Sequence, residues 1–195
     1  MDARLLMDSP RDRMVTAAIQ GMRRNGLAGA GINQVVAASG APKGSLYHYF
    51  PGGKNQLAQE ALERFGEERR AALMKLVQGA GDAPARLRRL FASLAKSLEK
   101  EDYAFGCAVA GVALDLQADS APLGAVCTAQ LDLWTEALAP AFDPLPPARR
   151  QAWARLTITT FEGALMQARA RRSREPLLEA GELLAEAVRH EISLA

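Results

Sequence analysis

Apolar positions recur every three or four residues along almost the whole chain, which is the spacing of amphipathic helices. Met14, Ala18 and Met22 share one face after Ser9-Pro10, a capping residue followed by a proline suited to the first helical position. With glycine, proline and aspartate as breaks, the pattern predicts helices over about residues 9–26, 31–39, 42–50, 55–78, 84–101, 106–117, 120–140, 147–171 and 176–192. Because no segment alternates as a strand would, the expected fold class is all-α.

Residues 31–50 predict two short helices joined by a turn, which is a helix-turn-helix. The apolar face of the first helix is supplied by Val35, Val36 and Ala38. This helix ends at Gly40, because glycine can adopt the positive φ of a helix end. Pro42 is expected to start the second helix, in which Leu46 and Phe50 lie four apart and face inward. A helix-turn-helix lays its second helix in the major groove of DNA.

The other side chains of the second helix suit contact with phosphates and base edges. They are Lys43, Gly44, Ser45, Tyr47, His48 and Tyr49. Ala41 stands at the expected cap position and has no side-chain acceptor, so the first N–H groups of this helix could bind a phosphate. The alternative is an ordinary surface helix whose two tyrosines pack partly against the core.

These residues resemble the DNA-binding signature of the TetR/AcrR family of bacterial repressors and, more narrowly, its LmrA/YxaF-like branch. The resemblance rests on Gly31-Ile32-Asn33-Gln34, on Gly40-Ala41-Pro42-Lys43-Gly44-Ser45-Leu46-Tyr47-His48-Tyr49-Phe50, and on Pro51-Gly52-Gly53-Lys54 with Leu57. Gly106-Cys107-Ala108-Val109-Ala110 and Val112-Ala113-Leu114-Asp115 also look like the ligand domain of that branch. Tyr49 departs from the branch, which usually has a histidine there.

The resemblance implies a ligand-responsive repressor that binds a palindromic double-stranded DNA operator as a homodimer. It implies a helix-turn-helix domain of three helices over residues 1–54, and a helical ligand-binding and dimerisation domain over residues 55–195 with helix 55–78 as connector. Its expected DNA-binding residues are Gly31, Asn33, Pro42, Lys43, Gly44, Ser45, Tyr47, His48, Tyr49 and Lys54. The alternative is a helix-turn-helix protein regulated by a protein partner or by redox chemistry of Cys107 and Cys127.

The middle helices contain aromatic and aliphatic side chains with a few isolated polar groups, which is how small-molecule sites are built. The expected ligand-binding residues are Phe91, Leu94, Phe105, Cys107, Val109, Gln130, Trp134, Phe161, Glu162 and Met166. Plain core packing is the alternative for each of them. A small apolar or aromatic ligand fits the composition of this set.

The last two predicted helices each carry a continuous apolar stripe with small residues that allow close helix packing. The stripes predict dimer-interface residues Trp153, Leu156, Thr160, Ala164, Leu177, Gly181, Leu184 and Val188. The alternative is that both stripes face the core of their own chain. The resemblance favours the homodimer, since TetR-like proteins dimerise through their last two helices.

Charge and composition agree with this interpretation. The net charge is +2, but residues 1–54 contain seven basic and three acidic residues, and phosphate binding needs such a basic end. The chain has no apolar run of membrane-spanning length and no signal-peptide pattern, so a cytoplasmic protein without membrane contact is expected. Its two cysteines are expected to be buried and reduced. Neither histidine stands in a catalytic pattern, and no phosphate loop or metal motif is present, so no enzyme, cofactor or metal is expected.

Overall fold

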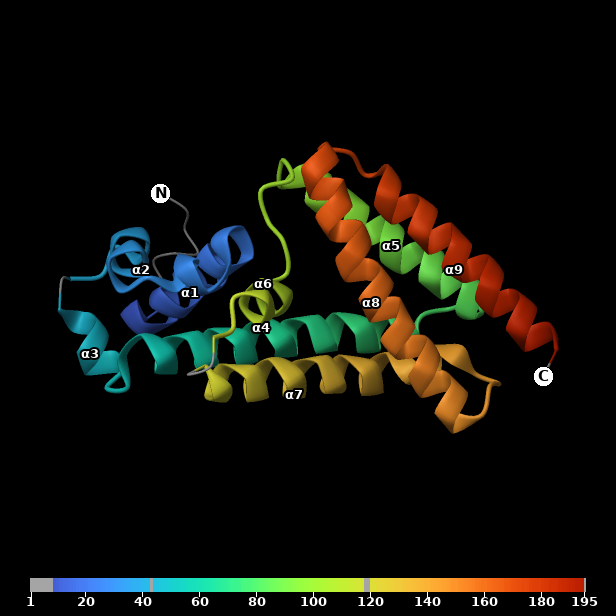
Figure 1. Ribbon diagram of the computed structural model, residues 1–195, viewed down its shortest axis with the longest axis horizontal. Helices are drawn as coiled ribbons and strands as arrows, with labels where there is room; N and C mark the ends of the chain where they lie inside the picture. Colours follow the sequence, from blue (N-terminus) through green and yellow to red (C-terminus); the bar gives the residue numbers. More distant parts are fainter. Residues whose placement is uncertain (1–8, 43, 118–119, 195) are drawn as a thin grey trace. The chain divides into compact units, whose positions relative to one another are not determined.

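The computed structural model describes residues 9–42, 44–117 and 120–194, and all regular elements among these residues are helical (Figure 1). The all-α prediction is therefore confirmed. The chain divides into two compact units, one made of Met1–Glu67 with Cys107–Gln130 and the other of Glu68–Gly106 with Leu131–Ala195. Helices α4 (Gly53–Gln78) and α7 (Ala121–Leu138) contribute residues to both units. The functional boundary at residue 54 stays a prediction.

The first unit begins with α1 (Pro10–Asn25), which starts as the sequence predicts. The Ser9 hydroxyl accepts a hydrogen bond from the Asp12 N–H at 3.1 Å, and Pro10 occupies the first helical position. Met14, Ala18 and Met22 form its buried face. A short 3-10 helix, η2 (Gly26–Ala30), follows at once and was not predicted.

Helix α1 and η2 approach each other closely enough for backbone to meet backbone at Gly21 and Gly29. A Cβ atom on Gly21 would lie 2.0 Å from the carbonyl oxygen of Gly29, which is far inside van der Waals contact. Only glycine fits at such a distance. This contact fixes η2 against α1, and η2 leads directly into α2 (Ile32–Ser39).

Helices α3 (Ser45–Tyr49), α4 and α6 (Ala108–Leu114) complete the unit with the first part of α7. The predicted inward face of α4 is confirmed, since Leu57, Ala61, Leu62 and Phe65 are buried. Helix α6 packs against α1 and η2 and is shorter than the sequence predicts. At the start of α6 the Cys107 sulfur accepts a hydrogen bond from the Ala110 N–H at 3.5 Å. At its other end the Asp115 carboxylate accepts a hydrogen bond from the Leu27 N–H of η2.

The second unit contains α5 (Ala83–Lys100), the 3-10 helix η3 (Ala139–Phe142), α8 (Pro147–Arg171) and α9 (Glu175–Ser193). Helix α9 packs against both α5 and α8 (Figure 1). Arg88 of α5 donates two hydrogen bonds to the Glu182 carboxylate of α9, at 2.7 and 2.5 Å. A Cβ atom on Gly181 would lie 2.6 Å from Phe91 Cβ, so α5 and α9 can pack at this distance only with glycine at position 181.

The stripe on α9 faces the core of its own chain, which corrects its assignment to a dimer interface. Leu177, Gly181, Leu184 and Val188 are all buried. The reason is that α5 presents an apolar face of its own, centred on Phe91, and covers this side of α9. On α8, Trp153 and Ala164 are buried as well, Thr160 is half-buried and Leu156 is exposed. Among the described residues, no helix is long and apolar enough to cross a membrane.

Candidate nucleic-acid interface

The turn between α2 and α3 is held by short polar contacts. Gly40 ends α2 with a φ of 64°, as predicted. The Ser39 hydroxyl donates to the Val36 carbonyl at 3.1 Å and accepts the Ala41 N–H at 3.3 Å. Arg13 of α1 donates from Nε to the Ser39 carbonyl at 3.0 Å, so the end of α2 is fixed to α1.

Helix α3 begins at Ser45, three residues later than predicted, and spans five residues. Pro42 is not its first residue and Ala41 is not its cap, because Gly44 precedes the helix with a φ of 90°. Both the N–H and the hydroxyl of Ser45 donate to the Pro42 carbonyl, at 3.2 and 2.7 Å. The N–H of Ser45 is thus bonded within the chain, and a phosphate site at the start of this helix stays a prediction.

The orientation of α3 agrees with the sequence. Leu46 and Phe50 are buried, whereas Tyr47 is 59% exposed and His48 is exposed. Tyr49 is half-buried and packs edge-on against His48, with ring centroids 4.9 Å apart. Lys43 lies outside the described residues. The side chains on the outer side of α3 are thus donors and acceptors that a ligand could meet.

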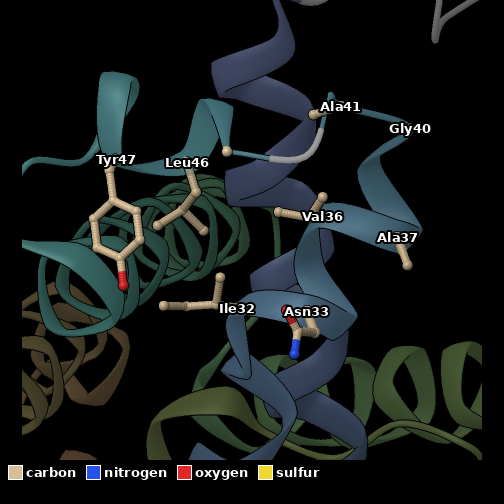
Figure 2. A pocket seen from close by; sticks show the side chains of 9 residues that line it. Ile32, Asn33, Val36, Ala37, Gly40, Ala41, Leu46 and Tyr47 are labelled. Atoms are coloured by element: carbon tan, nitrogen blue, oxygen red, sulfur yellow. The ribbon is translucent and has the colours of Figure 1, made fainter.

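An open hollow of about 720 Å³ lies between α2 and α3 (Figure 2). We call it the α2–α3 hollow; it is lined by Ile32, Asn33, Val36, Ala37, Gly40, Ala41, Gly44, Leu46 and Tyr47. Of the predicted DNA-binding residues it brings together Asn33, Gly44 and Tyr47. The predicted apolar face of α2 needs a correction, because Ala38 is exposed and Val36 is half-buried beside the hollow, and Val35 alone of the three is buried.

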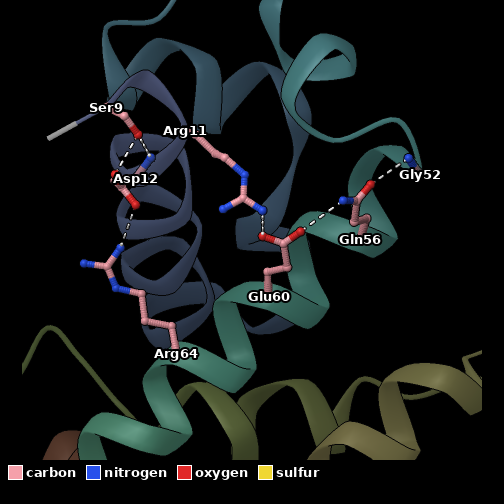
Figure 3. Close-up of polar contacts among 7 residues, drawn as sticks. All are labelled: Ser9, Arg11, Asp12, Gly52, Gln56, Glu60 and Arg64. Atoms are coloured by element: carbon pink, nitrogen blue, oxygen red, sulfur yellow. Dashed lines mark hydrogen bonds and ion pairs between the residues drawn. The ribbon is translucent and has the colours of Figure 1, made fainter.

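A chain of polar contacts joins α1 to the turn before α4 (Figure 3). Arg11 pairs with Glu60, whose other oxygen accepts a hydrogen bond from Gln56 Nε2 at 3.0 Å. Gln56 Oε1 in turn accepts the Gly52 N–H at 2.8 Å. The Arg11 guanidinium also lies 5.1 Å from the centre of the Phe50 ring. These contacts hold the glycine-rich turn that precedes Lys54, a half-buried residue of the predicted interface.

Asp115, at the end of α6, connects α6 to η2. Its Oδ2 atom accepts the Leu27 N–H of η2 at 2.8 Å. Gly26 adjoins this contact with a φ of 59°, and a Cβ atom there would lie 2.1 Å from the same oxygen. A Cβ atom on Gly111 of α6 would lie 3.3 Å from the Met22 carbonyl of α1. Sequence reasoning placed Asp115 in a resembling motif but assigned it no contact.

The predicted ligand-binding residues belong to both units. Cys107, Val109 and Gln130 are buried in the first unit. In the second unit Phe91 and Trp134 are buried, while Leu94, Phe105, Phe161 and Glu162 are half-buried. Met166 is 65% exposed on α8, whereas the other nine are buried or half-buried. For all ten residues a ligand role stays a prediction.

Within the second unit, Phe91 of α5 packs edge-on against Phe161 of α8, with ring centroids 6.5 Å apart and an interplanar angle of 79°. In the first unit, the Cys127 thiol donates to the Val109 carbonyl at 3.7 Å, and burial raises the pKa of this thiol. A raised pKa disfavours the thiolate, which is the reactive form. Cys127 therefore fits the expected reduced, buried side chain better than a redox sensor.

Comparison with known proteins gives two family matches. Residues 15–61 match the family model described as bacterial regulatory proteins, tetR family. Residues 83–183 match the C-terminal domain of LmrA/YxaF-like transcriptional regulators. The first match contains α2, α3 and the α2–α3 hollow, and the second contains α6 and Asp115.

Individual proteins are similar over most of the chain. An uncharacterized HTH-type transcriptional regulator of Mycobacterium tuberculosis, Rv0196, is 36% identical over 178 residues, which cover 88% of this chain and 90% of that protein. The HTH-type transcriptional regulator LmrA of Bacillus subtilis is 32% identical over 124 residues, or 64% of this chain and 66% of that protein. The structure of the TetR family regulator CifR with 26-base-pair double-strand operator DNA is similar in fold, with a TM-score of 0.78, 22% identity and coverage of 91% of this chain and 96% of that chain.

Proposed function

The chain belongs to the TetR family of bacterial transcriptional regulators, in its LmrA/YxaF-like branch, and we propose that it is a repressor which a small-molecule ligand releases from a palindromic operator. It is a DNA-binding transcriptional regulator and not an enzyme.

Operator contact is proposed for the outer side of α3 and for the residues beside it. Tyr47 and His48 are exposed on α3, Asn33 on α2, and Lys54 follows the turn held by Gln56. In a helix-turn-helix the second helix enters the major groove while the first crosses the backbone. We assign base contacts to Tyr47 and His48 and a phosphate contact to Lys54.

Homodimerisation is proposed through the outer faces of α8 and α9. Their buried stripes are occupied within the chain, but both helices also carry exposed large apolar side chains, namely Leu156, Met166, Leu178 and Leu183. Covering such residues is what a dimer interface achieves. A two-fold dimer would place two recognition helices on successive half-sites, about 34–36 Å apart, and would explain a palindromic operator.

The contact of α6 with α1 and η2 is the observation that carries the proposed regulation. Helix α6 lies in the segment that matches the C-terminal domain of the branch, yet it packs against α1 and η2. The Asp115 carboxylate accepts the N–H of Leu27, five residues before α2 begins at Ile32. A ligand that binds one position of α6 more tightly than another would therefore move η2, which leads into α2. Only such a difference in ligand affinity can shift the equilibrium between a DNA-binding and a DNA-releasing state.

The test uses the operator that the full chain selects from a randomised duplex library. A panel of amphipathic aromatic compounds is titrated into the complex, and DNA release is followed by fluorescence anisotropy. We expect a compound that releases DNA from the wild type and from Asp132→Ala, an exposed matched control, but releases it less from Asp115→Ala. A complex that no compound weakens, but that a bacterial protein fraction dissociates, would instead support regulation by a protein partner.

A further inference from the structure

The residues that the structure describes in the walls of the α2–α3 hollow carry no charge, although they lie in the part of the chain that binds DNA. We propose that this hollow receives the 5-methyl group of thymine in the major groove and so gives the regulator a thymine preference in each half-site. The inference rests on the DNA binding of the proposed function and adds a specificity determinant to it. It does not depend on whether a ligand releases the DNA.

The described lining of the hollow is mainly apolar. Helix α2 contains no charged residue, and its positions 32, 36 and 37 place Ile32, Val36 and Ala37 along one side of the hollow. Figure 2 shows Ile32 and Val36 of α2 facing Leu46 and Tyr47 of α3. An apolar wall is a poor partner for a phosphate, because it would desolvate the charge without a compensating donor. The hollow therefore suits an apolar group of the DNA.

The position of the hollow identifies that group. Ala41 and Gly44, which precede α3, also line it, and the N-terminal residues of a recognition helix are those that contact base edges. Among the base edges of the major groove, thymine alone carries a methyl group. Asn33 and Tyr47 add polar atoms to the same walls and could bond the neighbouring base edges. Deoxyribose is the other apolar part of DNA, but contact with it would be independent of sequence.

The test removes single methyl groups from the DNA and matched side chains from the protein. Full-length protein is titrated with its selected operator, in which each thymine is replaced in turn by deoxyuracil. Burial of one methyl group corresponds to about a fourfold change in affinity, so we expect one thymine in each half-site to show that loss. Two variants are compared: Ala37→Ser, at an exposed residue that lines the hollow, and Ala38→Ser, the same change at the next, also exposed residue, which does not.

We expect the ratio of affinities for thymine and deoxyuracil operators to fall towards one in Ala37→Ser and to stay at about four in the wild type and in Ala38→Ser. Val36→Thr, which keeps the side-chain shape but adds a hydroxyl, should act like Ala37→Ser. Thermal unfolding checks that each variant is folded. The proposal would be overturned if the selected operators preferred thymine at no position, or if no single deoxyuracil replacement lowered the affinity. It would also be overturned if the loss of affinity on deoxyuracil replacement were equal in all variants. None of these results bears on ligand release.

Discussion

Replacing Gly21 with alanine tests the backbone contact that fixes η2 against α1. In the interior of a helix, alanine is more favourable than glycine by about 1 kcal/mol when there is space for its methyl group. Here the added Cβ would lie 2.0 Å from the oxygen and 2.7 Å from the carbon of the Gly29 carbonyl. Both atoms belong to the backbone, so they cannot rotate away, and overpacking of this kind costs about 1–3 kcal/mol or more. A contact this short puts the cost at the upper end of that range, so we expect a net loss of about 2 kcal/mol in the free energy of unfolding.

Urea-induced unfolding followed by far-ultraviolet circular dichroism measures this loss, and operator affinity should fall with it because η2 leads into α2. Gly124→Ala is the matched control in the same unit. Its added Cβ would meet Leu116 Cδ1 at 3.4 Å, an ordinary contact, so the control should gain about 0.4–1 kcal/mol. If Gly21→Ala stabilised the protein as much as Gly124→Ala, the close approach of α1 and η2 would be refuted.

Three further changes test other parts of the molecule. Leu183→Glu, at a residue 66% exposed on α9, should weaken dimerisation at least about tenfold in sedimentation equilibrium, while Leu114→Glu, 86% exposed on α6, should not; equal effects would contradict the proposed interface. Lys54→Ala should lower the slope of log affinity against log salt by about one, and an unchanged slope would remove Lys54 from the phosphate contacts. The hydrogen bond from Arg88 lowers the pKa of Glu182 below its ordinary 4.5, so the ion pair stabilises the fold above pH 4.5. This stabilisation is lost as the pH falls through the lowered pKa of Glu182. Glu182→Gln should therefore make the thermal midpoint less sensitive to acid, and unaltered acid sensitivity would show that the pair contributes nothing.

Much of the fold could be predicted from the sequence because helix starts and buried faces leave local signals. Ser9-Pro10 predicted the start of α1, and the pair Leu46 and Phe50 predicted which side of α3 is buried. The start of α3 was missed because Pro42 alone indicates a helix start, whereas the turn also needs Gly44 at a φ of 90°. No periodicity marked η2, since its five residues form little more than one turn.

The partner of an apolar stripe cannot be predicted from the stripe itself. Leu184 and Val188 have the spacing of an interface and are nevertheless buried, because α5 covers them within the chain. The candidate site shows the same limit. Exposure of Tyr47 follows from helical spacing, but the α2–α3 hollow and the bond from Leu27 to Asp115 depend on residues that meet only in the folded chain.

Run-off transcription tests most directly whether this regulator is a repressor. The template carries the selected operator across its promoter, and a template with a scrambled operator serves as control. We predict that full-length protein lowers the transcript from the first template in proportion to operator occupancy and leaves the second unchanged. Transcript that stays constant at full operator occupancy, or increases, would contradict repression.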